Sequence, residues 1–242
     1  MDRTRPCLYL LQSLYSEKLL ASDGSKFPED PQDRVLCETC GIRRWSRRSL
    51  AEQFKVGPIN PAVAHNKREE PVIWSFLTQS CLVHSSIASE MESQGFTGYE
   101  LWPISVRFRD GFLSHDYRRL VVTGWAGMAD PMSGIELVES CAGCDVRRFS
   151  PLKHPRHLVD VSKWKGEDFF VVWPLANKIV VTQRLVDLFQ AAKVRTCEIR
   201  PLVEEPNERE RFDWRDGYLV AGLVTAFPTE LADRYRCPPE IV

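Results

Sequence analysis

Two stretches of the chain, residues 85–104 and 183–202, repeat the same alternation of apolar and polar positions. In each, apolar residues recur at helical spacing and are followed by an extended segment that ends in Glu-x-x-Pro. The pattern therefore predicts two helices, each running into a strand. The apolar positions that carry this prediction are Ile87, Met91, Leu185, Leu188, Phe189 and Ala192.

A strand-like apolar run precedes each predicted helix. Residues 72–77 lead to the first helix, and residues 169–173 and 179–181 lead to the second. Thr182 is a suitable N-cap for the second helix, and His84 occupies the same place in the first. The coarse unit is thus strand, helix, strand, occurring twice.

Between the two units the pattern predicts more strands and a link. Residues 106–109 and 118–125 are apolar or alternating and predict strands, whereas residues 124–134 are rich in turn-forming residues. Residues 218–227 are a further candidate strand after a charged run at 207–211. Together these elements indicate an α+β fold of two similar strand-helix-strand halves.

A ten-residue phrase containing two cysteines also occurs twice. Residues 37–46 (CETCGIRRWS) return as residues 141–150 (CAGCDVRRFS), with both cysteines, both arginines and the serine identical. We interpret the shared phrase, together with the shared helices, as an internal duplication. The expected organisation is a single globular unit over 1–242, with a first repeat half at 37–104, a second at 141–202 and a C-terminal extension at 203–242.

Two C-x-x-C pairs supply the ligands of a tetrahedral four-thiolate zinc site, with each pair filling two corners. We therefore predict one structural Zn²⁺ ion held by Cys37, Cys40, Cys141 and Cys144, with zinc-knuckle turns bracing the two halves. Because 100 residues separate Cys40 from Cys141, the whole fold must bring the two turns together. Zinc binding in such sites is worth roughly 10–16 kcal/mol of folding free energy.

Three alternatives for these cysteines remain open. His154 and His157 follow the second pair and could complete a local site of two cysteines and two histidines, although a solvated Pro-rich loop also accounts for them. A thioredoxin-like redox pair would place the motif at a helix N-terminus after a strand. The motifs could also be free of metal. Cys81 and Cys197 lie in or beside apolar runs and are predicted to be small core residues.

Composition narrows the class of protein. The 242 residues carry 32 basic and 33 acidic side chains, a near-neutral balance that argues against a general nucleic-acid binder. No apolar stretch reaches about 18 residues and no signal peptide is recognisable, so we expect a cytoplasmic protein without a membrane span. Eight cysteines in that compartment are expected to be reduced.

The sequence contains no recognisable catalytic motif, and we expect a protein without enzymatic activity. Trp164 and Trp214 lie among charged residues, as tryptophans that anchor protein–protein interfaces do. Partial burial under a loop is the simpler interpretation of both. Trp74, Trp125 and Trp173 lie in apolar runs and are predicted to be core residues.

The order of these features resembles the double-CXXCG motif proteins, a bacterial family of immunity proteins for contact-delivered Sit-type toxins. The resemblance covers most of 37–202: Leu-Cys-Glu-Thr-Cys-Gly at 36–41, the second cysteine pair, Leu-Val-Asp at 158–160, Asp-Phe-Phe at 168–170 and the strand-to-helix stretch at 179–186. Asp145 stands where the family has Gly, and Gln183 where it has an acidic residue.

The resemblance implies a protein that binds and neutralises a cognate protein toxin in the producing cell. It defines neither the toxin nor the residues that contact it. The competing class is a zinc-ribbon nucleic-acid-binding or regulatory module, which the Arg-Arg pair after each cysteine pair favours.

Overall fold

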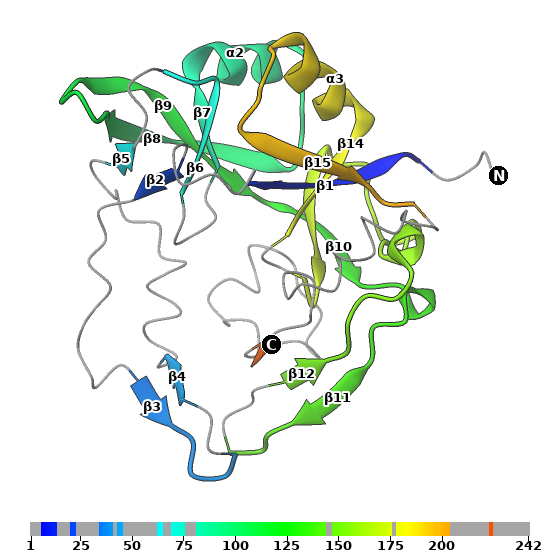
Figure 1. The fold of residues 1–242 in the computed structure, drawn as a ribbon. Helices are drawn as coiled ribbons and strands as arrows, with labels where there is room; N and C mark the ends of the chain where they lie inside the picture. Colours follow the sequence, from blue (N-terminus) through cyan, green and yellow to red (C-terminus); the bar gives the residue numbers. More distant parts are fainter. Residues whose placement is uncertain are drawn as a thin grey trace.

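The computed structural model of the chain describes residues 6–13, 20–22, 34–40, 43–45, 62–64, 69–75, 81–143, 147–175, 178–203 and 223–224. These residues form a mixed α+β structure, with strands in several sheets and two short α-helices. The two helices lie next to each other at one end of the molecule, and the hairpins β3–β4 and β11–β12 lie at the other (Figure 1).

The first large sheet closes into a barrel with strand order β2-β5-β8-β9-β7-β6. In it, the pairs β2–β6 and β5–β8 are parallel. The pairs β2–β5, β6–β7, β7–β9 and β8–β9 are antiparallel. Its strands are β2 (Leu20–Ser22), β5 (Ala62–Ala64), β6 (Val72–Ser75), β7 (Cys81–His84), β8 (Tyr99–Arg107) and β9 (Leu113–Val122).

The second large sheet has the order β10-β13-β14-β1-β15. Here β10 pairs with β13 in the parallel sense, and the remaining pairs are antiparallel. The N-terminal strand β1 lies between β14 and β15, which come from the far end of the described chain. The strands are β1 (Leu8–Ser13), β10 (Gly124–Met128), β13 (Phe169–Trp173), β14 (Ile179–Thr182) and β15 (Cys197–Pro201).

The remaining elements are small. Two 3₁₀ turns and two short antiparallel sheets complete the described structure. They are β3 (Arg34–Leu36), β4 (Arg43–Trp45), β11 (Leu137–Ser140), β12 (Arg147–Phe149), β16 (Leu223–Val224), η2 (Pro131–Ser133) and η3 (Pro155–His157).

The helices α2 (Ser85–Ser93) and α3 (Gln183–Ala191) confirm the predicted helical stretches. His84 caps α2, and its ring accepts a hydrogen bond from the Ser86 amide at 3.2 Å. Thr182 stands at the same place before α3, but its hydroxyl donates to Asp168 at 2.8 Å and caps no helix amide. After each helix the chain turns through a left-handed residue, Gly95 or Lys193.

One core cluster joins both helices to both large sheets. Ile87 and Met91 of α2 and Leu185 and Phe189 of α3 are buried in it. Burying an apolar side chain of this size stabilises a fold by about 1.5–3 kcal/mol. The apolar residues whose helical spacing predicted these elements are therefore the residues that face the core. The cluster also contains Val72, Val83, Phe169 and Val181 from the sheets.

The predicted core tryptophans Trp74 and Trp173 are confirmed, each with 2% of its surface exposed, while Trp125 packs half-buried against the core. Cys81 is also buried, and Cys197 packs against the same cluster. Burial raises the pKa of the Cys81 thiol well above its usual value and that of Cys197 to about 11, so both stay protonated. Within the described residues, no helix has the length and apolar character needed to span a membrane.

The prediction of a turn-rich link at 124–134 is wrong for its first half, because residues Gly124–Met128 form strand β10. Gly124 lies so close to β13 that a Cβ there would overlap the carbonyl oxygen of Phe169. A Cβ at Gly98 would overlap the same oxygen. Gly124, which belongs to the stretch that looked like a turn, thus allows close strand approach.

Candidate metal centre

Three cysteines of the two pairs lie at or near the ends of short strands. Cys37 directly follows β3, Cys40 precedes β4, and Cys141 directly follows β11. The hairpins share a register: Leu36 pairs with Arg43 in the first, and Ser140 with Arg147 in the second. In both hairpins, the residue just before the repeated phrase thus pairs with the first arginine of the Arg-Arg pair. Each C-x-x-C motif therefore occupies the connection between two short antiparallel strands.

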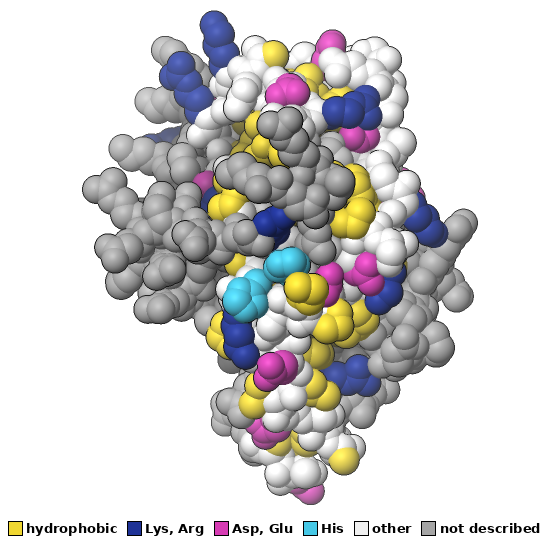
Figure 2. Space-filling model, turned by 90° about the vertical axis from the view of Figure 1, so that its right-hand side faces the viewer, with side chains coloured by type: hydrophobic (Ala, Val, Ile, Leu, Met, Phe, Trp, Pro, Cys, Tyr) yellow, Lys and Arg dark blue, Asp and Glu magenta, His cyan; other side chains and the backbone are white. Residues whose placement is uncertain are grey.

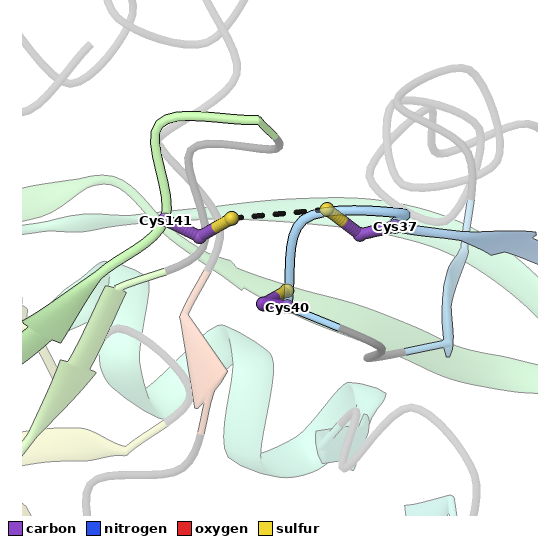
Figure 3. Close-up of side chains that lie close together, drawn as sticks. All are labelled: Cys37, Cys40 and Cys141. Carbon is purple, nitrogen blue, oxygen red and sulfur yellow. Dashed lines mark hydrogen bonds between the residues drawn. The ribbon is translucent and has the colours of Figure 1, made fainter.

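The fold brings thiols of the two hairpins together (Figure 3). The sulfur atoms of Cys37, Cys40 and Cys141 lie within 4.8 Å of one another, and those of Cys37 and Cys141 are 3.7 Å apart. A zinc tetrahedron with Zn–S bonds of about 2.3 Å has edges of about 3.8 Å. A disulfide would instead need about 2.05 Å between the sulfurs. The observed spacing suits a shared metal ion.

The two turns interlock beside the thiols. A Cβ added at Gly143 would overlap the Thr39 side chain and lie 3.4 Å from the Cys37 sulfur. Residue 143 is therefore limited to glycine by its close approach to the other turn. Cys37 and Cys141 are buried, and Cys40 is partly exposed. Burial keeps competing water away from the sulfurs.

The positions of the described residues disfavour two of the alternatives for the cysteines, a site with histidine ligands and a thioredoxin-like redox pair. His154 and His157 do not belong to the three-cysteine cluster, although both are described. The described cysteines of the motifs lie between strands and not at a helix N-terminus, which disfavours a thioredoxin-like pair. Cys144 lies outside the described residues, as do Cys237 and Trp214. Three cysteines that could bind a metal such as zinc are thus in place.

Trp164 lies half-buried against the second sheet. Its indole N–H donates to the Glu167 carbonyl at 3.1 Å, and its ring lies 5.3 Å from that of Phe170. It belongs to the border of a core cluster that includes Leu158 and Val172. This placement matches the simpler interpretation, partial burial under a loop.

The surface near the second hairpin is mixed in character. Leu137 and Val138 of β11 are more than half exposed, and Figure 2 shows hydrophobic side chains on the lower projection, at the level of this hairpin in Figure 1. Basic and acidic side chains are interspersed over the same face.

A buried carboxylate, which the sequence did not single out, links α3 to the loop after α2. Asp168 accepts hydrogen bonds from the Thr97 amide at 3.1 Å and from the Arg184 guanidinium at 2.9 Å. Arg184 also donates to the Gln94 carbonyl at 2.6 Å and lies over the Phe96 ring. Only the phrase Asp-Phe-Phe marked this position in the sequence.

Comparisons with models of known protein families and with curated protein sequences found no match for this chain.

Proposed function

We propose that Cys37, Cys40, Cys141 and Cys144 bind one structural Zn²⁺ ion. The 3.7 Å separation of the Cys37 and Cys141 sulfurs supports a shared ion. Cys144 follows Cys141 at the spacing by which Cys40 follows Cys37. The metal would supply a cross-link between two hairpins that are far apart in the sequence. No chemical step is assigned to it, because four thiolates leave no open coordination position.

We further propose that the chain arose by internal duplication, and the strand pairing supports this idea. The sheet orders β2-β6-β7-β9-β8 and β10-β13-β14-β1-β15 correspond strand by strand, with the same parallel and antiparallel senses. The helices begin 98 residues apart, and so do β7 and β14.

In this correspondence the first unit begins with β1 and the second with β9. Strand β1 completes the second large sheet, which otherwise belongs to the second unit, and β9 completes the barrel, which otherwise belongs to the first. The repeats would then be longer than 37–104 and 141–202, because they include these exchanged strands. Neither half could complete its sheet alone. Such exchange makes the single globular unit over 1–242 the natural description.

The function that we propose is neutralisation of a cognate protein toxin by tight binding. The observation that carries it is the order of motifs shared with the double-CXXCG immunity proteins, from the first cysteine pair to the strand-to-helix stretch at 179–186. A metal-braced scaffold with a mixed polar and apolar surface is compatible with that role. The partner is a protein and not a membrane.

Co-expression tests this function. The protein encoded by the neighbouring reading frame is induced in cells that carry either this gene or an empty vector. We expect growth to be restored only with this gene, and we expect the two proteins to co-purify. If the neighbouring protein is toxic and co-expression of this gene gives no protection, the proposed function is wrong.

The competing nucleic-acid-binding role rests on Arg43, Arg44, Arg147 and Arg148, which follow the cysteine pairs. Titration with duplex DNA and with RNA at several salt concentrations separates the two roles. Phosphate binding must weaken steeply with salt, because binding releases condensed counterions. Tight, salt-sensitive binding would favour the nucleic-acid role over toxin neutralisation.

A further inference from the structure

A groove of about 640 Å³ lies between the two helices. It belongs to neither the cysteine cluster nor any motif found in the sequence. Both helices contribute to its walls, and their apolar residues form its floor. The residues that line it are Pro71, Ser86, Ile87, Glu90, Gln94, Arg184, Asp187, Leu188, Ala191 and Ala192.

Arg184 occupies one end of the groove. Its guanidinium donates hydrogen bonds to the buried carboxylate of Asp168 at 2.9 Å and to the backbone carbonyl of Gln94, the C-cap residue of α2, at 2.6 Å. The guanidinium carbon lies 4.5 Å from the centre of the Phe96 ring. One arginine therefore fills this end, held by a carboxylate, a helix C-terminus and an aromatic face.

The other end has the same backbone without the arginine. Ser86 stands 98 residues before Arg184, at the same place in α2, and Ala192 stands at the place of Gln94. The helix ends match, since the amides of Gln94 and Ala192 both bond to the carbonyl four residues earlier, at 3.0 and 2.9 Å. Small side chains thus leave this end open next to the C-terminus of α3, where backbone carbonyls favour a cation.

Two carboxylates line the groove between these ends. The Glu90 carboxylate accepts a hydrogen bond from the side-chain amide of Gln94 at 2.7 Å. The Asp187 carboxylate accepts one from the side-chain amide of Gln183 at 2.8 Å. Each carboxylate can accept more hydrogen bonds than this. The basic residues Lys193 and Arg195, which follow α3, do not line the groove. The one cation among the lining residues, Arg184, is already paired with the Asp168 carboxylate. The charge that the groove offers to a ligand is therefore negative.

The floor suits the stem of a long cationic side chain. Ile87 and Leu188 are buried apolar residues that line the groove. Lysine and arginine cover such surface with their methylene groups and keep the charged head near carboxylates or carbonyls. A guanidinium offers five donors for the groove's acceptors, whereas an ammonium offers three.

We propose that the open end of this groove binds an arginine side chain of a protein partner. This side chain would occupy the position that corresponds to Arg184 at the other end, where α2 has Ser86. The choice of a protein as the source of that arginine rests on the proposed toxin-binding function. The groove itself is defined by its charge and shape.

The test is a titration of the full chain with N-acetyl-arginine amide as the probe. Binding is detected by NMR of the methyl groups of Ala191, Ala192 and Leu188. We expect saturable shifts of these methyl signals at millimolar probe. The matched control is N-acetyl-citrulline amide, which has nearly the same shape without the charge. Equal shifts with both compounds, or shifts located elsewhere, would overturn the inference.

Two variants refine the result. Ser86→Arg should fill the open end and abolish probe binding, whereas Ser89→Arg, on the same helix but outside the groove, should leave it unchanged. Glu90→Gln keeps the side-chain shape and should weaken binding roughly two- to fivefold, as loss of one exposed ion pair does. Unchanged binding in Ser86→Arg would contradict the proposal.

This experiment and the toxin-protection assay can fail independently. Protection of cells by a chain that does not bind the arginine probe would overturn the groove inference alone. Binding of the probe by a chain that gives no protection would leave the groove inference standing and overturn the toxin-neutralising function.

Discussion

If the cysteine cluster binds zinc as proposed, removing the metal should loosen the contact between two hairpins that lie far apart in the sequence. Cys37 and Cys141 are 104 residues apart in the sequence, and their sulfurs are 3.7 Å apart in the fold. An ion that binds only the folded state stabilises it by about 4 kcal/mol when its free concentration is a thousand times its dissociation constant. For a chain of this size, that corresponds to a fall in Tm of about 8–16 °C when the metal is lost.

The measurement is thermal unfolding of the full chain in reducing buffer, before and after incubation with a zinc chelator, with metal content determined in parallel. We expect about one zinc ion per chain and a large fall in Tm on chelation. Adding zinc back should restore Tm, and excess zinc should raise it further, because the ion binds only the folded state.

Two variants show whether the effect belongs to this site. Cys141→Ser should begin with a lowered Tm and respond little to the chelator. Cys7→Ser should behave as the unchanged chain, because Cys7 is exposed and lies outside the cysteine cluster. The reasoning is refuted if the purified chain holds no metal, or if chelation and Cys141→Ser both leave Tm unchanged.

Three further predictions concern the rest of the fold. Asp168→Asn should lower the free energy of unfolding by about 2–4 kcal/mol in urea titrations, because the Arg184 guanidinium loses its buried counter-charge; an unchanged midpoint would contradict this role. Gly98→Ala should prevent stable folding, since its Cβ would overlap the Phe169 carbonyl. Gly95→Ala has open space around it and should cost only about 1–2 kcal/mol, because residue 95 has a left-handed backbone; circular dichroism melts compare the two. Burial raises the pKa of Cys197 to about 11, so the folded state keeps a proton that the unfolded state loses, and stability should fall as the pH rises from about 9 to 11. Urea midpoints at both ends of that range, with Cys197→Ala as the less pH-sensitive comparison, measure the effect.

Local pattern was enough to predict the helices and many of the strands. The helical spacing of Leu185 and Phe189 exists because one face of α3 enters the core, so the sequence records the burial directly. The strand predicted at 169–173 is found at those residues, because all five side chains are buried. Signals of this kind depend on near neighbours in the chain.

Long-range partners could not be predicted in the same way. The run at Leu8–Leu11 is a short apolar stretch in the sequence, and it pairs with Ile179–Thr182 and with Ile199–Pro201. Nothing in a short apolar run states which strands will flank it. The groove was missed for the same reason, because Ser86 and Ala191 carry no pattern until the helices are placed together.

The cysteine site lies between these cases. Repetition of the phrase identified which thiols belong together, and the fold supplies their approach. Three of the four predicted ligands are described, and they lie within 4.8 Å of one another. The interlocking of Gly143 with Thr39 had no sequence signal beyond a glycine between two cysteines.

The position of β1 has a consequence for protein synthesis. This strand is made long before its partner β15, which ends at Pro201, so nearly the whole described chain must be made before the second sheet is complete. At about 5–20 residues per second, β1 waits roughly 10–40 s with both edges unpaired. During that interval the nascent chain exposes Leu8, Leu10 and Leu11, which are buried in the finished fold, and the unpaired strand edges can pair with other chains.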